Sequence, residues 1–187
     1  MNADALTRRT VLTATTSVLL GGALANCSAT AQAPVGSGTL IHQLTVDSDS
    51  MQPTIVQGQV ITVDGLTPGT YKPRRQDIVV VHPTAEYTGM QPSDLMVRRV
   101  LGIPGDTVSC DGIGSPLILN GTALAEPYLN KGDAPSTITF NVKVPAGCLW
   151  LLGDHRAIAL DCRYHLSDPD HGAIPLRNVV GIYHPST

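Results

Sequence analysis

Short apolar runs separated by turn-forming residues are the feature that most limits how this chain can fold. Val, Ile, Leu and Thr gather in these runs, and Gly, Pro, Asn or Asp stands between almost every pair of them. No window keeps the 3.6-residue period of an amphipathic helix. The sequence therefore predicts a mainly β fold with antiparallel sheets. The runs lie at 40–46, 60–63, 78–81, 95–103, 107–110, 117–119, 138–142, 149–152 and 179–183.

Length and composition agree with one β-rich domain. The 187 residues include 18 Gly and 14 Pro, and aromatic residues make up only 4%. A chain of this length can bury a genuine hydrophobic core. Asn120-Gly121 is the clearest hairpin turn, because both residues tolerate positive φ. Charged residues make up 14%, the net charge is -3, and basic residues form no run longer than a pair, which excludes nucleic acid as a partner.

The cysteines point to no metal site. Apart from Cys27, the chain contains Cys110, Cys148 and Cys162. This odd number permits one disulfide among three possible pairs and leaves one thiol over. The spacing is not that of a metal site, and no cofactor motif occurs in the sequence. We therefore expect neither a metal nor a cofactor.

Residues 1–33 have the pattern of an export signal or membrane anchor followed by a tether. Arg8-Arg9 precedes about fifteen uncharged residues. This segment is shorter and more polar than a typical membrane-spanning helix of about 20 residues. The pair resembles a twin-arginine export motif. Leu24 to Cys27 resembles a lipoprotein processing site, which would leave Cys27 lipid-modified. Cleavage after Ala31 and an uncleaved anchor are the alternatives. We expect an exported domain, anchored at the outer face of the cytoplasmic membrane by the lipid or by the signal segment.

A dense polar run from Asp47 to Ile55 contains a candidate nucleophile. If the backbone is extended there, Ser48 and Ser50 point to the same side. Ser50 would then attack a carbonyl while Ser48 offers a second hydroxyl beside it. The alternative is a plain loop between two strands, since Ser, Asp and Pro are typical loop residues.

Several blocks of the chain, taken in order, closely resemble the boxes of the type I signal peptidases, which are membrane-bound serine endopeptidases. The resemblance extends from about Thr45 to Gly181. The boxes match Ser48 to Thr54, Arg99 to Asp106, Leu119 to Gly121, Glu126 to Tyr128, Gly153 to Arg156, Asp161 to Tyr164, Ile174-Pro175 and Asn178 to Gly181.

The resemblance implies a β-rich catalytic domain at 34–187, with a small β insertion at about 107–146, that cuts exported proteins after small-x-small sites. Its partners would be a signal peptide or exported protein and the membrane surface. Ser50 would be the nucleophile, and Ser48 with the Ser50 backbone N–H would form the oxyanion hole. Met51 and Ile55 would form an apolar rim facing substrate or lipid. The further positions with a binding or structural role are Met51, Pro53, Arg99, Asp106, Gly153, Asp154, Arg156, Ala159, Asp161 and Arg163.

The pattern departs from the family at the general base. Bacterial members carry a lysine where this chain has Arg98. Burial can free the lone pair of a lysine, whereas a guanidinium stays protonated, and deprotonating it at pH 7 costs about 7 kcal/mol. Ala159 replaces a hydroxyl residue that supports the family's lysine. His155 is an alternative base, because relatives in the endoplasmic reticulum use histidine.

Two main hypotheses follow from the sequence. The first is an active signal-peptidase-like serine endopeptidase with an altered base. The second is an inactive homologue that binds exported peptides or assists assembly of a surface structure. A specialised peptidase of the same superfamily, such as a pilin-maturation enzyme, is a third possibility. An extended groove beside a strand edge would bind peptide by β-addition in either main case.

Overall fold

The computed structural model describes residues 43–87, 90–91 and 93–185. The expected export signal at 1–33, including Cys27, lies outside these residues, as does the start of the first predicted strand. Within the described ranges, no helix is both long and apolar enough to cross a membrane.

Strands make up most of the regular structure in the described part of the chain, which confirms the mainly β prediction. Two short 3₁₀ helices accompany them, η1 (Cys162–His165) and η2 (Leu176–Asn178). The strands are β1 (Gln43–Thr45), β2 (Val60–Gly65), β3 (Ile78–Val81), β4 (Met96–Gly102), β5 (Thr107–Cys110), β6 (Ile118–Leu119), β7 (Thr122–Ala123), β8 (Phe140–Lys143), β9 (Cys148–Leu152), β10 (Ile174–Pro175) and β11 (Val179–Tyr183).

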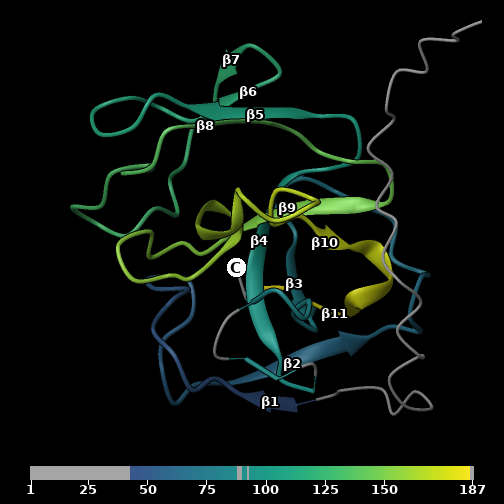
Figure 1. Ribbon diagram of the computed structural model, residues 1–187. Coiled ribbons are helices and arrows are strands. Elements are labelled where there is room, and N and C mark those ends of the chain that lie inside the picture. The colour runs from purple at the N-terminus through teal and green to yellow at the C-terminus, as the bar shows by residue number, and fades with distance from the viewer. Residues whose placement is uncertain (1–42, 88–89, 92, 186–187) are drawn as a thin grey trace, which may run out of the picture.

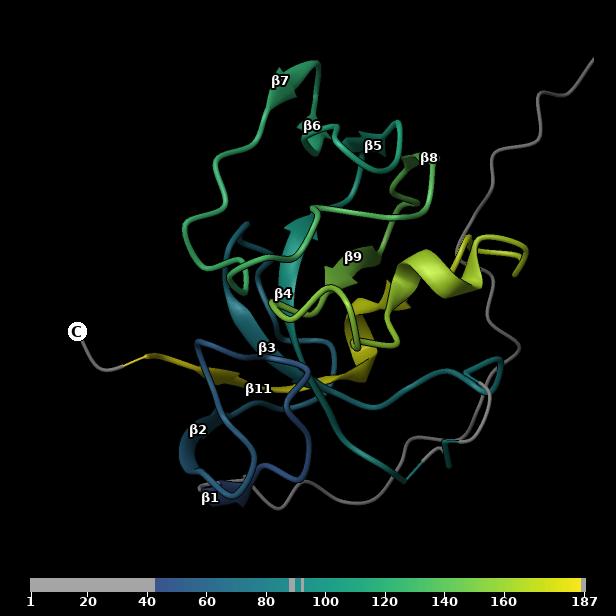
Figure 2. The same ribbon diagram turned by 90° about the vertical axis from the view of Figure 1, so that its left-hand side faces the viewer.

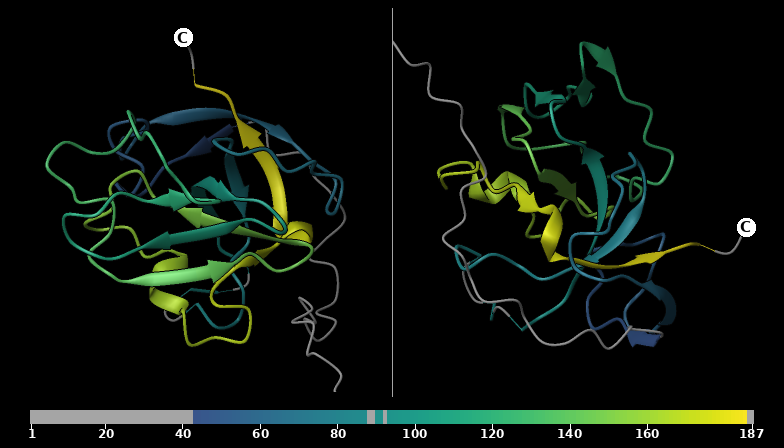
Figure 3. Two further views of the ribbon diagram at one scale, coloured as in Figure 1. Left: turned by 90° about the horizontal axis from the view of Figure 1, so that it is seen from above. Right: turned by 90° about the vertical axis from the view of Figure 1, so that its right-hand side faces the viewer.

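The strands form two antiparallel sheets. The larger sheet has the order β1-β2-β11-β3-β4-β9-β10, and the smaller one has the order β7-β6-β5-β8. The smaller sheet lies at the top of Figure 1, above β9, while β1 and β2 lie at the opposite end of the molecule. Figure 2 and the right-hand view of Figure 3 show the same separation, and the left-hand view of Figure 3 looks onto the molecule from above. All four strands of the smaller sheet come from the segment 107–146 that the sequence analysis treats as an insertion.

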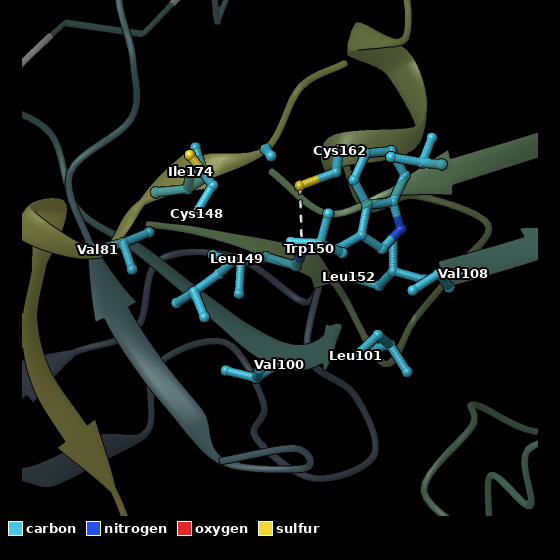
Figure 4. Close-up of a cluster of buried hydrophobic side chains, with 14 of the residues drawn as sticks. Val81, Val100, Leu101, Val108, Cys148, Leu149, Trp150, Leu152, Cys162 and Ile174 are labelled. Atoms are coloured by element: carbon cyan, nitrogen blue, oxygen red, sulfur yellow. Dashed lines mark hydrogen bonds between the residues drawn. The ribbon is translucent and has the colours of Figure 1, made fainter. Parts of the chain in front are cut away.

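Two hydrophobic clusters cover opposite faces of the larger sheet at β3. Val79 and Val81 belong to the larger cluster, whereas Ile78 and Val80 belong to the smaller one. Successive side chains of a strand point to opposite faces, so a strand covered on both sides must be apolar throughout. The larger cluster also joins the two sheets, because Val108 of β5 packs with Trp150 and Leu152 of β9 (Figure 4).

The predicted strand runs all contain strands, but the pattern missed β7 and β10. Each of these has only two residues, too few to show alternation. The Asn120-Gly121 hairpin is confirmed, since Leu119 pairs with Thr122 and both turn residues have positive φ, 50° and 82°. The disulfide permitted among Cys110, Cys148 and Cys162 does not form, because Cys110 and Cys162 are free, buried thiols.

Asp106 ties the turn after β4 to the smaller sheet. Its carboxylate accepts hydrogen bonds from Arg75 at 2.7 and 2.8 Å, from Asn120 Nδ2 at 2.8 Å and from the Ile103 N–H at 3.0 Å. The hydrogen bond from Arg75 is the main reason why the pKa of Asp106 falls to about 2. The carboxylate is therefore a structural link between β4 and the β6–β7 hairpin.

Asp106→Asn should lower the free energy of unfolding by about 1 to 3 kcal/mol at pH 7, the usual loss for a charged hydrogen-bond partner. A depressed carboxyl pKa stabilises the fold above the unfolded value of 3.8 and loses this effect as pH falls toward the folded value of about 2. The difference in the free energy of unfolding between variant and wild type should therefore become smaller as the pH falls through this range. Urea denaturation at a series of pH values measures it.

Asp111→Asn is the matched control, because Asp111 is exposed and follows β5 directly. It should unfold like the wild type. An equal loss in both variants, or a difference that does not change with pH, would contradict the role of Asp106.

Candidate functional site

Ser50 lies in a turn between β1 and β2. The backbone turns there, since the Gln52 N–H donates to the Asp49 carbonyl at 3.0 Å and the Ile55 N–H to the Met51 carbonyl at 2.9 Å. The stretch is thus a turn and not the extended run that would align Ser48 with Ser50. In Figure 2 this connection rises from the lower end of the molecule toward β4 and β9.

Two apolar side chains fix this turn to the sheet. Met51 and Ile55 are 1% and 0% exposed and belong to the cluster beneath β2 and β3. Met51 also lines the cleft beside Ser50, so a rim that faces substrate stays a prediction for Met51, whereas Ile55 lies wholly within the core. Their burial stabilises the turn, because each apolar side chain removed from water contributes about 1.5 to 3 kcal/mol. Pro53, between them, is exposed.

The structure brings Ser50 and Arg98 into direct contact. Arg98 is the third residue of β4 and pairs with Val79 of β3. Its Nη1 donates to Ser50 Oγ at 2.9 Å and to the Val97 carbonyl at 2.8 Å, and its Nη2 donates to the Leu160 carbonyl at 2.9 Å. The family resemblance therefore pointed to both members of the pair, although they are 48 positions apart.

The environment of Arg98 is unusual for a charged group. The residue is 8% exposed, and its Nε has no hydrogen-bond partner in the described part of the protein. Desolvation by burial lowers the pKa of Arg98, while the charge of Asp161 acts in the opposite direction. A guanidinium has donors only, so this side chain cannot accept the hydroxyl proton of Ser50 while it is charged.

Ser48 approaches Ser50 through the backbone. The Ser50 N–H donates to Ser48 Oγ at 3.2 Å, and Ser48 itself is exposed. The two donors expected for the oxyanion hole are thus neighbours. A hydroxyl has one proton and two lone pairs, so Ser48 Oγ keeps its own proton for another acceptor.

The loop after β9 packs directly against Ser50. The His155 N–H donates to the Ser50 carbonyl at 3.1 Å, and the Gly153 N–H donates to Asp161 Oδ2 at 3.1 Å. Gly153 leaves no room for a side chain, because a Cβ would lie 2.3 Å from Ala159 Cβ and 2.6 Å from the Ser50 carbonyl oxygen. Ala159 itself is fully buried.

The His155 ring contacts Asp49 and Asp133. Its Nδ1 lies 3.3 Å from the Asp49 carbonyl oxygen, which requires a proton on Nδ1, and its Nε2 lies 3.9 Å from Asp133 Oδ2. The loop thus brings His155 beside the turn through its backbone, with the ring directed at Asp49 and Asp133.

Three buried arginine–carboxylate pairs surround the site. Arg99 binds both oxygens of Asp154 at 2.8 and 2.6 Å. Arg163 binds both oxygens of Asp161 at 2.8 and 2.9 Å. Arg156 pairs with Glu126 and also donates to the Gly153 carbonyl at 2.8 Å. These contacts hold the 153–163 loop against β4 and against the turn that carries Ser50.

A cleft of about 620 Å³ opens beside Ser50. Ser48, Ser50 and Arg98 are among the residues that line it. The other lining residues are mainly apolar. They come from β1 and the turn after it, from the segment before β4 and the start of β4, and from the loop after β9, namely Leu44 to Asp47, Met51, Met90, Ser93 to Val97, Ile158 and Leu160.

Sequence reasoning missed several contributors to this site. Thr54 Oγ1 donates to Asp154 Oδ2 at 2.5 Å, and the Tyr128 ring lies 3.9 Å from Arg99 Cζ. Both residues lie in blocks that match the family, and this match was the signal by which the sequence could have identified them. No signal marked Leu160, whose backbone carbonyl receives Arg98, because carbonyl contacts depend on loop shape alone.

Comparison with known proteins identifies relatives. The family model described as "Signal peptidase, peptidase S26" matches residues 23–185. A protein named "Probable signal peptidase I" from Mycobacterium leprae is 31% identical over 175 residues, covering 79% of this chain and 59% of its own length. The signal peptidase I of Leptolyngbya laminosa is 32% identical over 138 residues, covering 73% of this chain and 63% of its own length. The resemblance to type I signal peptidases is thereby confirmed.

This chain therefore spans about six tenths of the length of these two relatives. The signal peptidase I of Bacillus caldolyticus is 30% identical over 148 residues, with 73% of each chain covered. Among solved structures, a signal peptidase I from Enterococcus faecalis aligns with a TM-score of 0.44 at 26% identity, covering 60% of this chain and 97% of that one.

Asp154→Asn should lower the free energy of unfolding by about 3 to 5 kcal/mol, because it leaves Arg99 as a buried charge without a counter-ion. Asp154 is 0% exposed. Thermal and urea denaturation measure the loss.

Asp64→Asn is the matched control at an exposed pair. Asp64 lies 3.3 Å from His184, and their side chains are 72% and 68% exposed. It should stay within about 1 kcal/mol of wild type. Equal losses in the two variants would show that the buried pairs do not hold the site together.

Proposed function

This chain belongs to the signal peptidase family, peptidase S26, and we propose that its domain binds exported peptides in the cleft beside Ser50 without cutting them efficiently. The observation that carries the proposal is the hydrogen bond from Arg98 Nη1 to Ser50 Oγ at 2.9 Å. A serine nucleophile needs a neighbour that takes its proton. Arg98 donates to the hydroxyl and cannot take that proton.

The free energy needed to deprotonate the Arg98 guanidinium also argues against efficient cleavage. Burial lowers the pKa of Arg98, but Asp161 nearby favours the charged form. General bases typically contribute about 10²- to 10⁴-fold to the rate, and this contribution is missing when the neighbour is permanently protonated. The ring of His155 does not replace it in the observed arrangement, since its Nδ1 faces the Asp49 carbonyl.

Open strand edges support peptide binding in this cleft. β1 is an edge strand with β2 as its neighbour. Met96 to Arg98 pair with β3 on one side, whereas the pairing of β4 with β9 begins at Arg99. Both segments line the cleft. Unpaired edges hydrogen-bond an added extended peptide, and pockets between them accept alternate side chains.

The substrates and location that the sequence suggests belong to the same proposal. The peptides would be signal peptides or exported proteins with small-x-small segments. The domain would work at the outer face of the cytoplasmic membrane, held there by residues 1–33 as a twin-arginine signal with a lipid on Cys27 or as an anchor. An assembly role for a surface structure fits the same binding activity.

A second candidate function is signal-peptide processing by a serine endopeptidase with an altered base. Ser50 lines the cleft, and the neighbouring Ser48 hydroxyl accepts from the Ser50 N–H and keeps its own proton to donate to an oxyanion, which favours this function. This arrangement of a hydroxyl and nearby donors is what acyl transfer requires.

Arg98→Lys combined with Ala159→Ser should create cleavage of a small-x-small peptide. The double variant restores a base and a supporting hydroxyl, and the rate should rise about 10²-fold or more over wild type, the usual contribution of a general base. Mass spectrometry of the peptide products measures the rate.

Ser50→Ala in the double-variant background is the control, and it should return cleavage to background. If the wild type already cleaves as fast as the double variant and Ser50→Ala abolishes that cleavage, the endopeptidase is the correct function and the binding role is wrong.

A further inference from the structure

Among the residues that the structure describes, no carboxylate pairs with the positive charge of Arg98. Arg99, Arg156 and Arg163, the other buried arginines of the described chain, each bind an acidic side chain. The acceptors of Arg98 are all neutral, and its Nε has none. Asp161 acts on Arg98 through its charge, but both of its oxygens are bonded to Arg163. The group of Arg98, Arg163 and Asp161 thus keeps one uncompensated positive charge.

The hydroxyls beside Arg98 add further donors. Ser50 Oγ accepts from Arg98 and Ser48 Oγ accepts from the Ser50 N–H. Since a hydroxyl carries one proton, each serine still has that proton to donate. Arg98, Ser50 and Ser48 all line the cleft. A buried cation beside two hydroxyl donors matches an anion with two acceptor oxygens.

We propose that this site binds the free C-terminal carboxylate of a peptide, whose preceding residues lie along the apolar cleft. One carboxylate oxygen accepts from the Arg98 guanidinium and the other from the Ser50 hydroxyl. The proposal rests on peptide binding in the cleft and names the class of peptide: one that already ends at this point, as the product of a cleavage does. Capture of a terminal carboxylate is a recurring mode of peptide recognition.

The rest of the cleft favours a peptide over a small anion. Its volume of about 620 Å³ and apolar lining would remain unfilled by a free phosphate or acetate. Asp47 and Asp94 also line it and are exposed, so they disfavour a second negative charge on the ligand. A neutral, apolar segment with one terminal carboxylate satisfies both conditions.

Three methionines make the cleft adaptable. Met51, Met90 and Met96 all line it, and the unbranched thioether side chain adjusts to different apolar partners. Discrimination should therefore depend more on the terminal carboxylate than on individual side chains of the peptide. This distinguishes the site from one that selects an internal peptide bond.

The test compares two forms of one labelled peptide that ends in Ala-Ser-Ala, a free acid and the C-terminal amide. Fluorescence anisotropy with the full chain gives both dissociation constants. The acid should bind about 10- to 100-fold more tightly, the range for a charge-assisted hydrogen bond. Arg98→Gln should remove the difference, whereas Arg177→Gln, at an exposed arginine of η2, should keep it.

Ser50→Ala provides a second variant that keeps the buried charge, and it should reduce the preference for the acid severalfold. Equal binding of acid and amide by wild type would overturn the carboxylate site while leaving the peptide-binding function intact. A preference that persists in Arg98→Gln would also overturn it. Binding of neither form would contradict both the carboxylate site and the proposed function.

Discussion

The hydrogen bond from Arg98 to Ser50 is the interaction around which the site is arranged. It joins the turn after β1 to the third residue of β4 and places a fixed cation where a serine peptidase needs a proton acceptor. Burial makes the arrangement costly, since a charge removed from water must be compensated. The compensation available here comes from neutral oxygens, which leaves the charge suited to an incoming anion.

The neighbouring ion pairs use the carboxylates near Arg98 and hold the loop that packs beside it. Asp154 and Asp161 are both consumed by other arginines, Arg99 and Arg163, through two hydrogen bonds each. Those pairs position the loop that packs on Ser50. Gly153 of this loop lies so close to the Ser50 carbonyl oxygen that a side chain at this position would clash with it. The scaffold of a peptidase is therefore retained, while the charge at its centre differs in kind from a titratable lysine.

Much of the fold could be predicted from the sequence, because strand alternation and turn residues are local signals. β3 was evident as a run of four apolar residues, and the Asn120-Gly121 hairpin from its two turn residues. The contact between Ser50 and Arg98 could be expected from the resemblance to the type I signal peptidases, because both residues match ordered positions of that family. The full burial of Ile55 could not be expected, since an apolar residue in a turn can face core or solvent.

The sequence also could not predict that, among the described residues, no carboxylate binds Arg98. Asp161 lies in one of the family boxes, and the sequence does not say which arginine it binds. Only the three-dimensional contacts assign both Asp161 oxygens to Arg163. The sequence also did not reveal that Cys110 and Cys162 are free thiols, because the number of cysteines does not say which of them come close enough to pair. Short strands such as β7 leave no periodic signal at all.

The central claim is that Arg98 deprives Ser50 of a base, and the rate at which a serine-directed covalent inhibitor labels Ser50 tests it most directly. Intact-mass spectrometry follows labelling of the full chain between about pH 5 and pH 9, a range in which guanidinium stays charged. We predict that the wild type labels no faster than Ser50→Ala at every pH, and that Arg98→Lys labels faster as pH rises. Rapid, pH-dependent labelling of Ser50 in the wild type would contradict the account.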